Sequence, residues 1–156
     1  MSESDAPGNG VALRPYDPTD EADAIELWRR SWQAAYPEID FSERLEWWRE
    51  RWRSDTVVTS SIVVAARGAE IVGFVTVNGR TGYLDQLVVA PEAWGTPTAV
   101  LLLDQAKRAS SRGLDLHVNV DNGRALRFYE KHGFERVSES INPRSGRPVY
   151  LMRWLP

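Results

Sequence analysis

The sequence predicts an α/β domain in which a mixed, mostly antiparallel sheet carries helices on both faces. Two observations lead to this fold class. Segments with the period of strands or of helices follow one another as strand, two helices, three strands, helix, strand, helix and two strands. The 156 residues, of which 42% are hydrophobic and 26% charged, suffice for one domain with one core.

The first ten residues carry no fold signal. Residues 1–10 are small and polar and include Pro7 and Gly8, so we expect a disordered tail there. A single domain is then expected over residues 11–156. It begins with an edge strand, predicted at residues 11–16.

Two helices are predicted next, each with one apolar stripe. Asp17 followed by Pro18 is typical of a helix start, because proline is tolerated in the first turn, and Pro37 ends this helix. Asp40 and Glu43 then have the spacing of a capping residue and its partner. The stripes consist of residues three and four apart, which are Ile25, Trp28, Trp32 and Ala35, and then Leu45, Trp48 and Trp52.

The centre of the chain predicts three strands that run back and forth, followed by a helix. β-Branched residues fill 62–66 and 71–77 on either side of a turn at 67–70, and a further strand is predicted at 83–89. Residues 97–110 then have a helical pattern. It turns three apolar side chains inward, those of Leu101, Leu102 and Ala106.

The C-terminal part predicts a strand, a helix and two strands. An alternating strand at 116–120 is followed by Asn122, which can cap the next helix, and by Gly133 at the end of that helix. The last strands, at 134–140 and 149–154, are expected to pair across a loop of turn-forming residues.

The last strand has large apolar residues at alternating positions. Tyr150, Met152 and Trp154 share one face, which either forms a dimer surface or lies against the helices. The possible homodimer is therefore an expectation with a structural alternative.

Composition excludes several classes of protein. A net charge of −3 and a pI near 5.5 provide no field for nucleic acid. No apolar run reaches the roughly 20 residues of a membrane helix, and the N-terminus is not a signal peptide in pattern, so we expect a cytoplasmic protein without membrane contact. The chain has no cysteine, which rules out a cysteinyl thioester and a thiolate metal site.

Two segments carry a family resemblance. Residues 116–134 read LHVNVDNGRALRFYEKHGF, with Asn, Ala, Phe-Tyr and Gly-Phe at characteristic intervals, and residues 87–102 read LVVAPEAWGTPTAVLL. The chain resembles the GNAT superfamily of acyl-CoA-dependent N-acetyltransferases over nearly all of residues 11–154. The first segment is similar to the family's strand-Asn-helix unit, and the second is similar to its acyl-CoA loop and helix.

The resemblance implies acetyl-CoA as co-substrate and no metal. The backbone of the loop, at a helix N-terminus with partial positive charge, would bind the pyrophosphate, and a strand edge and Asn122 would hold the pantetheine arm. The cofactor-binding residues implied in this way are Leu87, Val88, Val89, Trp94, Gly95, Thr96, Pro97, Thr98, Ala99, Asn122, Ala125 and Phe128.

The loop departs from the family pattern of Gln or Arg, two residues, Gly, one residue, and Gly or Ala. Those positions are Trp94, Pro97 and Ala99 here, and Pro97 lacks the N–H that a glycine would offer to a phosphate. The hydroxyls of Thr96 and Thr98 are candidate replacements. The departures motivate an alternative function, a non-catalytic GNAT-fold module that binds acyl-CoA or a partner.

The resemblance also implies direct acyl transfer to an amine. Tyr129 falls on the family's general-acid position, and a phenol with a pKa near 10 is suited to protonating a thiolate. For the base we select Asp85, which shares a strand face with Leu87 and Val89. His117 and an ordered water are the alternatives.

The acceptor is predicted to be a primary amine on a small molecule or a peptide. The first two helices would build its pocket, and Tyr36 and Trp47, which lie off the apolar stripes, are the candidate substrate-binding residues. An aromatic pocket suits an apolar or a cationic amine. The charged residues Arg49, Glu50, Arg51 and Arg53 are interpreted as a solvated helix face, with recognition of an acidic substrate as the alternative.

Overall fold

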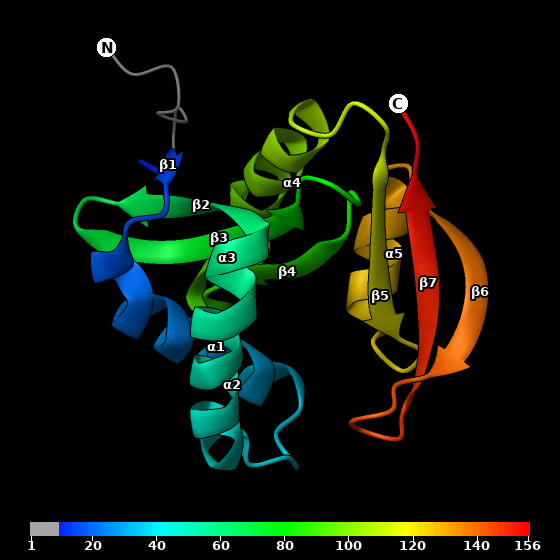
Figure 1. Ribbon diagram of the computed structural model, residues 1–156, viewed down its shortest axis with the longest axis horizontal. Helices are drawn as coiled ribbons and strands as arrows, with labels where there is room; N and C mark the ends of the chain where they lie inside the picture. Colours follow the sequence, from blue (N-terminus) through cyan, green and yellow to red (C-terminus); the bar gives the residue numbers. More distant parts are fainter. Residues whose placement is uncertain (1–9) are drawn as a thin grey trace.

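The computed structural model describes residues 10–156 and has the α/β architecture that the sequence predicts (Figure 1). The predicted tail, up to residue 9, lies outside the described residues. The strands of the described part form two sheets. The first is antiparallel and has the order β1 (Ala12–Pro15), β2 (Ser60–Arg67), β3 (Glu70–Asn78), β4 (Leu84–Val89). The second has the order β5 (Leu114–Asn119), β7 (Pro148–Trp154), β6 (Glu135–Ile141).

The helices follow the predicted order, with a longer second segment. They are α1 (Glu21–Ala35), α2 (Leu45–Arg51), α3 (Val57–Thr59), α4 (Thr98–Arg108) and α5 (Gly123–Lys131). A π-helical stretch joins α2 to α3, in which the Val57 N–H donates to the Trp52 carbonyl. Within residues 10–156, no helix is both long and apolar enough to span a bilayer.

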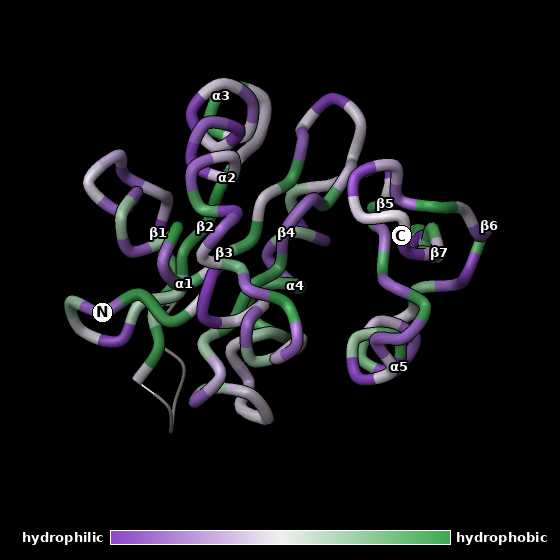
Figure 2. Tube along the Cα trace, turned by 90° about the horizontal axis from the view of Figure 1, so that it is seen from below, coloured by the Kyte–Doolittle hydropathy of each residue, from purple (hydrophilic) through white to green (hydrophobic). Residues whose placement is uncertain are grey.

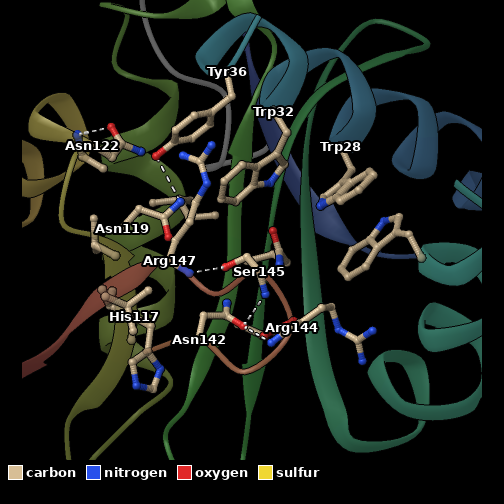
Figure 3. Close-up of a pocket in the computed structure, with 18 of the residues that line it drawn as sticks. Trp28, Trp32, Tyr36, His117, Asn119, Asn122, Asn142, Arg144, Ser145 and Arg147 are labelled. Atoms are coloured by element: carbon tan, nitrogen blue, oxygen red, sulfur yellow. Dashed lines mark hydrogen bonds between the residues drawn. The ribbon is translucent and has the colours of Figure 1, made fainter. Parts of the chain in front are cut away.

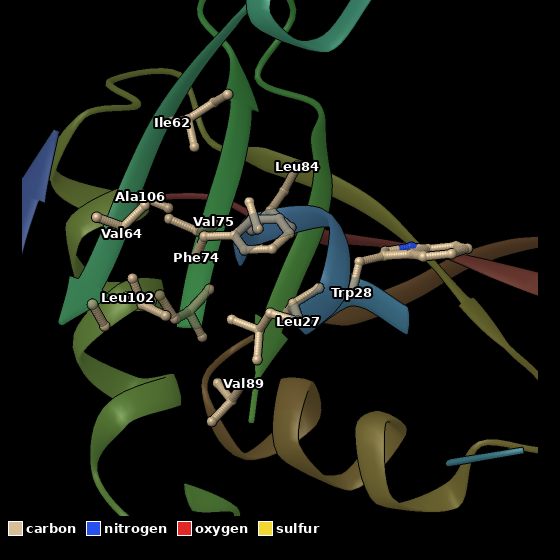
Figure 4. Close-up of a cluster of buried hydrophobic side chains, with 14 of the residues drawn as sticks. Leu27, Trp28, Ile62, Val64, Phe74, Val75, Leu84, Val89, Leu102 and Ala106 are labelled. Carbon is tan, nitrogen blue, oxygen red and sulfur yellow. The ribbon is translucent and has the colours of Figure 1, made fainter. Parts of the chain in front are cut away.

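Helices cover both faces of the first sheet, as predicted. Gly73 and Phe74 are neighbours on β3, so they face opposite sides of the sheet. A Cβ on Gly73 would lie 2.9 Å from Cδ1 of Leu102 in α4, whereas the Phe74 ring meets Trp52 edge-on at 5.4 Å. α4 therefore packs on one face, and Trp52, which follows α2, packs on the other. Figure 4 shows Leu102 and Ala106 of α4 beside the strands that carry Val64 and Phe74.

The core is built from strand aliphatics and tryptophans. β3 is buried from Ile71 to Val77, in agreement with the hydrophobic colouring of the central strands in Figure 2. Trp28 of α1 stacks on Trp48 of α2 with ring centroids 4.8 Å apart, and both side chains are buried. The predicted apolar stripes therefore fix the first two helices to each other and to the sheet.

In residues 10–156 a single isolated β-bridge joins the two sheets. Tyr83 and Asp115 form an isolated parallel bridge, and the Asp115 N–H donates to the Gly82 carbonyl at 3.0 Å. Beyond this bridge β4 pairs with β3 alone and β5 with β7 alone. The predicted single mixed sheet is thus divided in two, and β4 has one open edge.

The last strand differs from the prediction in its environment. β7 pairs with the preceding β6, as expected, but it also pairs with β5 and lies in the middle of its sheet (Figure 1). Met152 is fully buried, and Tyr150 and Trp154 pack against the core. This face therefore packs inside the molecule, so it is not the dimer surface considered from the sequence.

Boundaries differ from the predicted ones by one or two residues at most elements. α4 begins at Thr98 and not at Pro97, because Pro97 is the N-cap, and it ends at Arg108. α5 begins after Asn122, whose Oδ1 accepts a hydrogen bond from the Ala125 N–H at 3.2 Å, so the predicted cap is confirmed.

The junction between the sheets depends on a glycine. Gly82 has φ +75°, and a Cβ there would lie 2.6 Å from the Gly113 carbonyl oxygen. We expect Gly82→Ala to lower the free energy of unfolding by about 1–3 kcal/mol, because the side chain strains the backbone and forces the two sheets apart. Urea denaturation measures this change.

Gly79 provides the matched control three residues away. It has no positive φ, and a Cβ there would meet nothing within 4 Å. Gly79→Ala should therefore leave the stability within about 0.5 kcal/mol of wild type. Equal losses in the two variants would contradict this account of the junction.

Candidate active site

A cavity of about 440 Å³ opens where β4 and β5 part (Figure 3). Its walls come from α1, α2, β4, β5, the start of α5 and the loop between β6 and β7, residues 142–147. The predicted site residues that line it are Tyr36, Trp47, Asp85, Leu87, Asn122, Ala125 and Tyr129. Those that do not line it are Val88, Val89, Trp94, Gly95, Thr96, Pro97, Thr98, Ala99 and Phe128.

The open edge of β4 offers backbone donors. The Ala90 N–H donates to Val72 on β3 at 2.8 Å, and the Gln86 N–H donates to Thr76 Oγ1 at 3.1 Å. Because N–H groups alternate along a strand, those of Leu87 and Val89 point to the opposite edge, away from β3. β5 has diverged there, so these groups are available to a ligand that lies along the edge.

The start of α4 is a second region with free donors. In the described part of the chain, the N–H groups of Ala99 and Val100 have no hydrogen-bond partner. Gly95 has φ +83°, and a Cβ there would meet nothing within 4 Å, so the backbone before the helix is unobstructed. A helix N-terminus with free N–H groups and an open approach suits a phosphate.

The two threonines of this loop serve the loop itself. The Thr96 hydroxyl donates to the Ala93 carbonyl at 2.6 Å and lies 3.0 Å from the Thr98 hydroxyl, and Thr98 is fully buried. The expectation that these hydroxyls replace the donor lost at Pro97 does not fit this arrangement. The remaining candidate donors at this helix start are the backbone N–H groups of Ala99 and Val100.

Trp94 fixes the loop to its surroundings. Its Nε1 donates to the Val89 carbonyl at 2.9 Å, and the same carbonyl accepts from Ser31 Oγ at 2.8 Å. The Arg124 guanidinium lies 3.8 Å from the centre of the indole ring, and burial lowers the pKa of Arg124. This contact joins the loop to the first turn of α5.

Tyr129 reaches the cavity from α5. Its side chain is buried between Phe128 and Phe134, and within residues 10–156 its hydroxyl makes no hydrogen bond. Burial raises the pKa of Tyr129 well above its ordinary value, and the positive charge of Arg124 acts in the opposite direction. The hydroxyl is therefore protonated at neutral pH. Phe128 packs against Tyr129 and not into the cavity.

The acidic side of the cavity is a small charged cluster. Arg51 Nη2 lies 2.9 Å from Asp85 Oδ2, at an angle that makes this an ion pair and not a hydrogen bond. Beside it, the Tyr83 hydroxyl lies 2.6 Å from His117 Nδ1, and burial raises the pKa of Tyr83 to about 12. Tyr83 and His117 therefore share one hydrogen bond, whose direction is set by the tautomer of His117.

Tyr36 lines the cavity and also connects two elements through hydrogen bonds. Its hydroxyl donates to Asp121 Oδ1 at 2.9 Å and accepts from Asn119 Nδ2 at 3.0 Å, which links α1 to the end of β5. Burial raises the pKa of Tyr36 to about 12. Trp47 is more exposed, and the Arg144 guanidinium lies 3.9 Å from the centre of its ring.

The sequence reasoning missed the arginines of this cavity. Arg51 is expected from the sequence on a solvated helix face, yet it lines the cavity, as do Arg44, Arg144 and Arg147. The available signal is the pair of arginines inside the turn-forming segment 142–147. No group of three or more His, Cys, Asp or Glu side chains among the described residues is arranged to hold a metal ion.

Comparison with known proteins gives one consistent group. Residues 22–134 match the family model described as the acetyltransferase (GNAT) family. The peptidyl-lysine N-acetyltransferase YjaB of Salmonella typhimurium is 30% identical over 129 residues, which cover 82% of this chain and 86% of that protein.

Solved structures share the fold. PaiA N-acetyltransferase from Thermoplasma acidophilum, in complex with coenzyme A, has a TM-score of 0.76 and 20% identity over 94% of this chain and 99% of that one. The apo form of YjaB from Escherichia coli has a TM-score of 0.75 and 21% identity over 92% and 97% of the two chains.

The two hydrogen bonds of Tyr36 generate a stability prediction. Tyr36→Phe should lower the free energy of unfolding by about 1–2 kcal/mol, because Asp121 and Asn119 each lose a partner. Tyr150→Phe is the control, since the Tyr150 hydroxyl makes no hydrogen bond in the part of the chain described. Urea denaturation should separate the two variants, and losses of the same size would refute the structural role of Tyr36.

Proposed function

The chain belongs to the GNAT family of acyl-CoA-dependent N-acyltransferases, and from this membership we propose that it transfers the acetyl group of acetyl-CoA directly to a primary amine. The observation that carries the proposal is the Tyr129 hydroxyl, which lines the cavity beside the open edge of β4 and has no partner in the described chain. Family membership also bears out the resemblance inferred from residues 87–102 and 116–134.

Three sets of free donors support acetyl-CoA as the co-substrate. The N–H groups of Leu87 and Val89 would bind the pantetheine arm along the β4 edge, and the Asn122 side chain amide, whose oxygen caps α5, keeps its Nδ2 for the same arm. The N–H groups of Ala99 and Val100 would bind the pyrophosphate. We propose that Gly95 to Thr98, Val88, Ala125 and Phe128 shape this path, with Trp94 as its anchor.

Tyr129 is the proposed general acid. The amine nitrogen attacks the thioester carbonyl carbon, the carbon–sulfur bond breaks, and the departing sulfur takes the Tyr129 proton. Burial raises the pKa of Tyr129, and the positive charge of Arg124 lowers it. The same charge would stabilise the tyrosinate until solvent returns the proton.

Asp85 is the proposed general base. The acceptor ammonium must lose a proton before its nitrogen can attack. Asp85 lines the cavity and lies on β4, the strand that carries Leu87. Its ion pair with Arg51 holds the carboxylate toward the end of α2. His117 remains the alternative, because its ring also lines the cavity and its Nδ1 is held by Tyr83.

The acceptor amine would enter between α1, α2 and the 142–147 loop, where Tyr36 and Trp47 contact it. The YjaB relative is named a peptidyl-lysine N-acetyltransferase, so a lysine side chain is one acceptor of the proposed class and a small-molecule amine is the other. A cytoplasmic location, a homodimer and the absence of nucleic acid as a partner stay predictions from the sequence.

Substitution of Tyr129 tests the proposed reaction. We expect Tyr129→Phe to lower kcat for acetyl transfer by about 10²- to 10⁴-fold while acetyl-CoA binding stays unchanged, because only the proton donor is removed. Thiol release from acetyl-CoA in the presence of an amine library measures kcat. Tyr150→Phe is the matched control, and equal kcat in wild type and Tyr129→Phe would remove Tyr129 from the mechanism.

The same assay separates the two bases. If Asp85 is the base, Asp85→Asn should lower kcat/KM and abolish its fall toward acidic pH, whereas His117→Gln should keep that limb. The reverse pattern would assign the base to His117. Acetyl-CoA binding without transfer to any amine would favour the alternative of a non-catalytic binding module.

A further inference from the structure

The acceptor end of the cavity is unusually rich in arginine. Among the charged side chains that line it in residues 10–156, four are arginines and one is a carboxylate, namely Arg44, Arg51, Arg144, Arg147 and Asp85. The single carboxylate is already paired with Arg51 at 2.9 Å. The cavity therefore holds an excess of positive charge on the side where the acceptor enters.

Two of these arginines have no carboxylate partner. Within the described chain, Arg44 and Arg144 form no ion pair and instead lie on aromatic rings, Arg44 at 5.1 Å from the Phe41 ring centre and Arg144 at 3.9 Å from that of Trp47. Stacking of this kind orients a guanidinium but uses none of its N–H donors, which lie in the plane of the group. Both donor sets stay available to an anion.

The third arginine is held only loosely. Arg147 contacts Asp121 at 3.3 Å, and the Asp121 side chain is 62% exposed, so this ion pair contributes little. The Arg147 guanidinium also lies 5.0 Å from the Tyr36 ring centre. A ligand carboxylate could replace Asp121 with a better, two-point contact.

Hydrogen bonds within the loop that carries Arg144 and Arg147 preorganise its backbone. Asn142 Oδ1 accepts from the Arg144 N–H at 2.9 Å, and the Gly146 N–H donates to the Asn142 carbonyl at 2.8 Å. The Asn142 N–H in turn donates to the Arg147 carbonyl at 2.8 Å. Figure 3 shows the two arginines leaving this loop on either side of Ser145, with Arg147 directed toward Tyr36.

Aromatic and aliphatic side chains also line this cavity. Rings of α1 and α2 line it together with Ile39, and the tryptophans among them stack in pairs, Trp28 on Trp48 and Trp32 on Tyr36. A ligand that fits these walls has an aromatic or aliphatic body. The sequence-based expectation of a cationic acceptor does not fit, since a second positive charge would face arginines and no unpaired carboxylate.

We propose that the acceptor is a small primary amine that carries a carboxylate on an aromatic or aliphatic body, and that the arginines of the 142–147 loop supply the positive charge that attracts this carboxylate. The inference rests on the proposed acetyl transfer and specifies its substrate class. The amine would then point toward Asp85 and Tyr129, which line the same cavity.

The test compares amines that differ only in the carboxylate. The probes are L-phenylalanine against phenethylamine, L-leucine against isoamylamine, and 4-(aminomethyl)benzoate against benzylamine, with spermidine as the cationic probe. We expect kcat/KM to be at least about 10-fold higher for the carboxylate member of one or more pairs, because charge-assisted hydrogen bonds contribute that much. The preference should weaken as salt is added.

Arginine variants assign the preference to the loop. Arg144→Gln and Arg147→Gln should each raise KM for the preferred acid about 10-fold or more, with kcat and acetyl-CoA binding little changed. Arg108→Gln is the control, because the Arg108 guanidinium donates to Gln105 of its own helix and forms no ion pair in the described residues. Preference for spermidine, for the uncharged members of the pairs or for a lysine peptide without acidic residues would overturn the proposal, as would variants that keep the acid preference.

Ligand binding separates this inference from the reaction. The tryptophans of the cavity report on occupancy through their fluorescence, so the acids and amines are titrated in the absence of acetyl-CoA. If no amine is acetylated but the acids alone bind, and Arg144→Gln abolishes that binding, the anion site stands while the proposed transfer fails. If amines are acetylated but neither assay shows a preference for a carboxylate, the proposed transfer stands and the anion site is overturned.

Discussion

The parting of β4 from β5 after a single bridge at Tyr83 and Asp115 is the constraint on which the rest of this molecule depends. A continuous sheet would pair every backbone group of β4. Divergence leaves the N–H groups of Leu87 and Val89 without strand partners and opens the cavity next to them. Gly82 permits this junction, because a side chain there would collide with the facing backbone.

Two regions of the molecule offer donors suited to anions, and they differ in chemistry. At the start of α4, outside the cavity lining, backbone N–H groups have no partner in the described residues, and Arg124 is stacked on the nearby Trp94. At the acceptor end, arginines from α2 and from the 142–147 loop supply the charge. Tyr129 lines the cavity and is buried, its hydroxyl makes no hydrogen bond in the described residues, and it is the proposed proton donor for the leaving thiolate.

Local signals in the sequence predicted the fold class. Asn122 as a cap, the stripes through Trp28 and Trp48, and the order of the elements along the chain depend on neighbours within a few residues, so one sequence contains them. The arginines were missed because Arg51 and Arg144 face the cavity only after distant segments meet. The pairing of β7 with β5, which buries Met152, is likewise a long-range contact that no local pattern reports.

The central claim is that this cavity binds acetyl-CoA even though Pro97 removes one backbone donor from the loop. Calorimetric titration of the protein and of Pro97→Gly with acetyl-CoA tests it most directly. The account predicts micromolar binding by the wild-type chain and a similar affinity in the variant, because Ala99 and Val100 already supply free N–H groups. No binding by wild type, with binding recovered in Pro97→Gly, would contradict it.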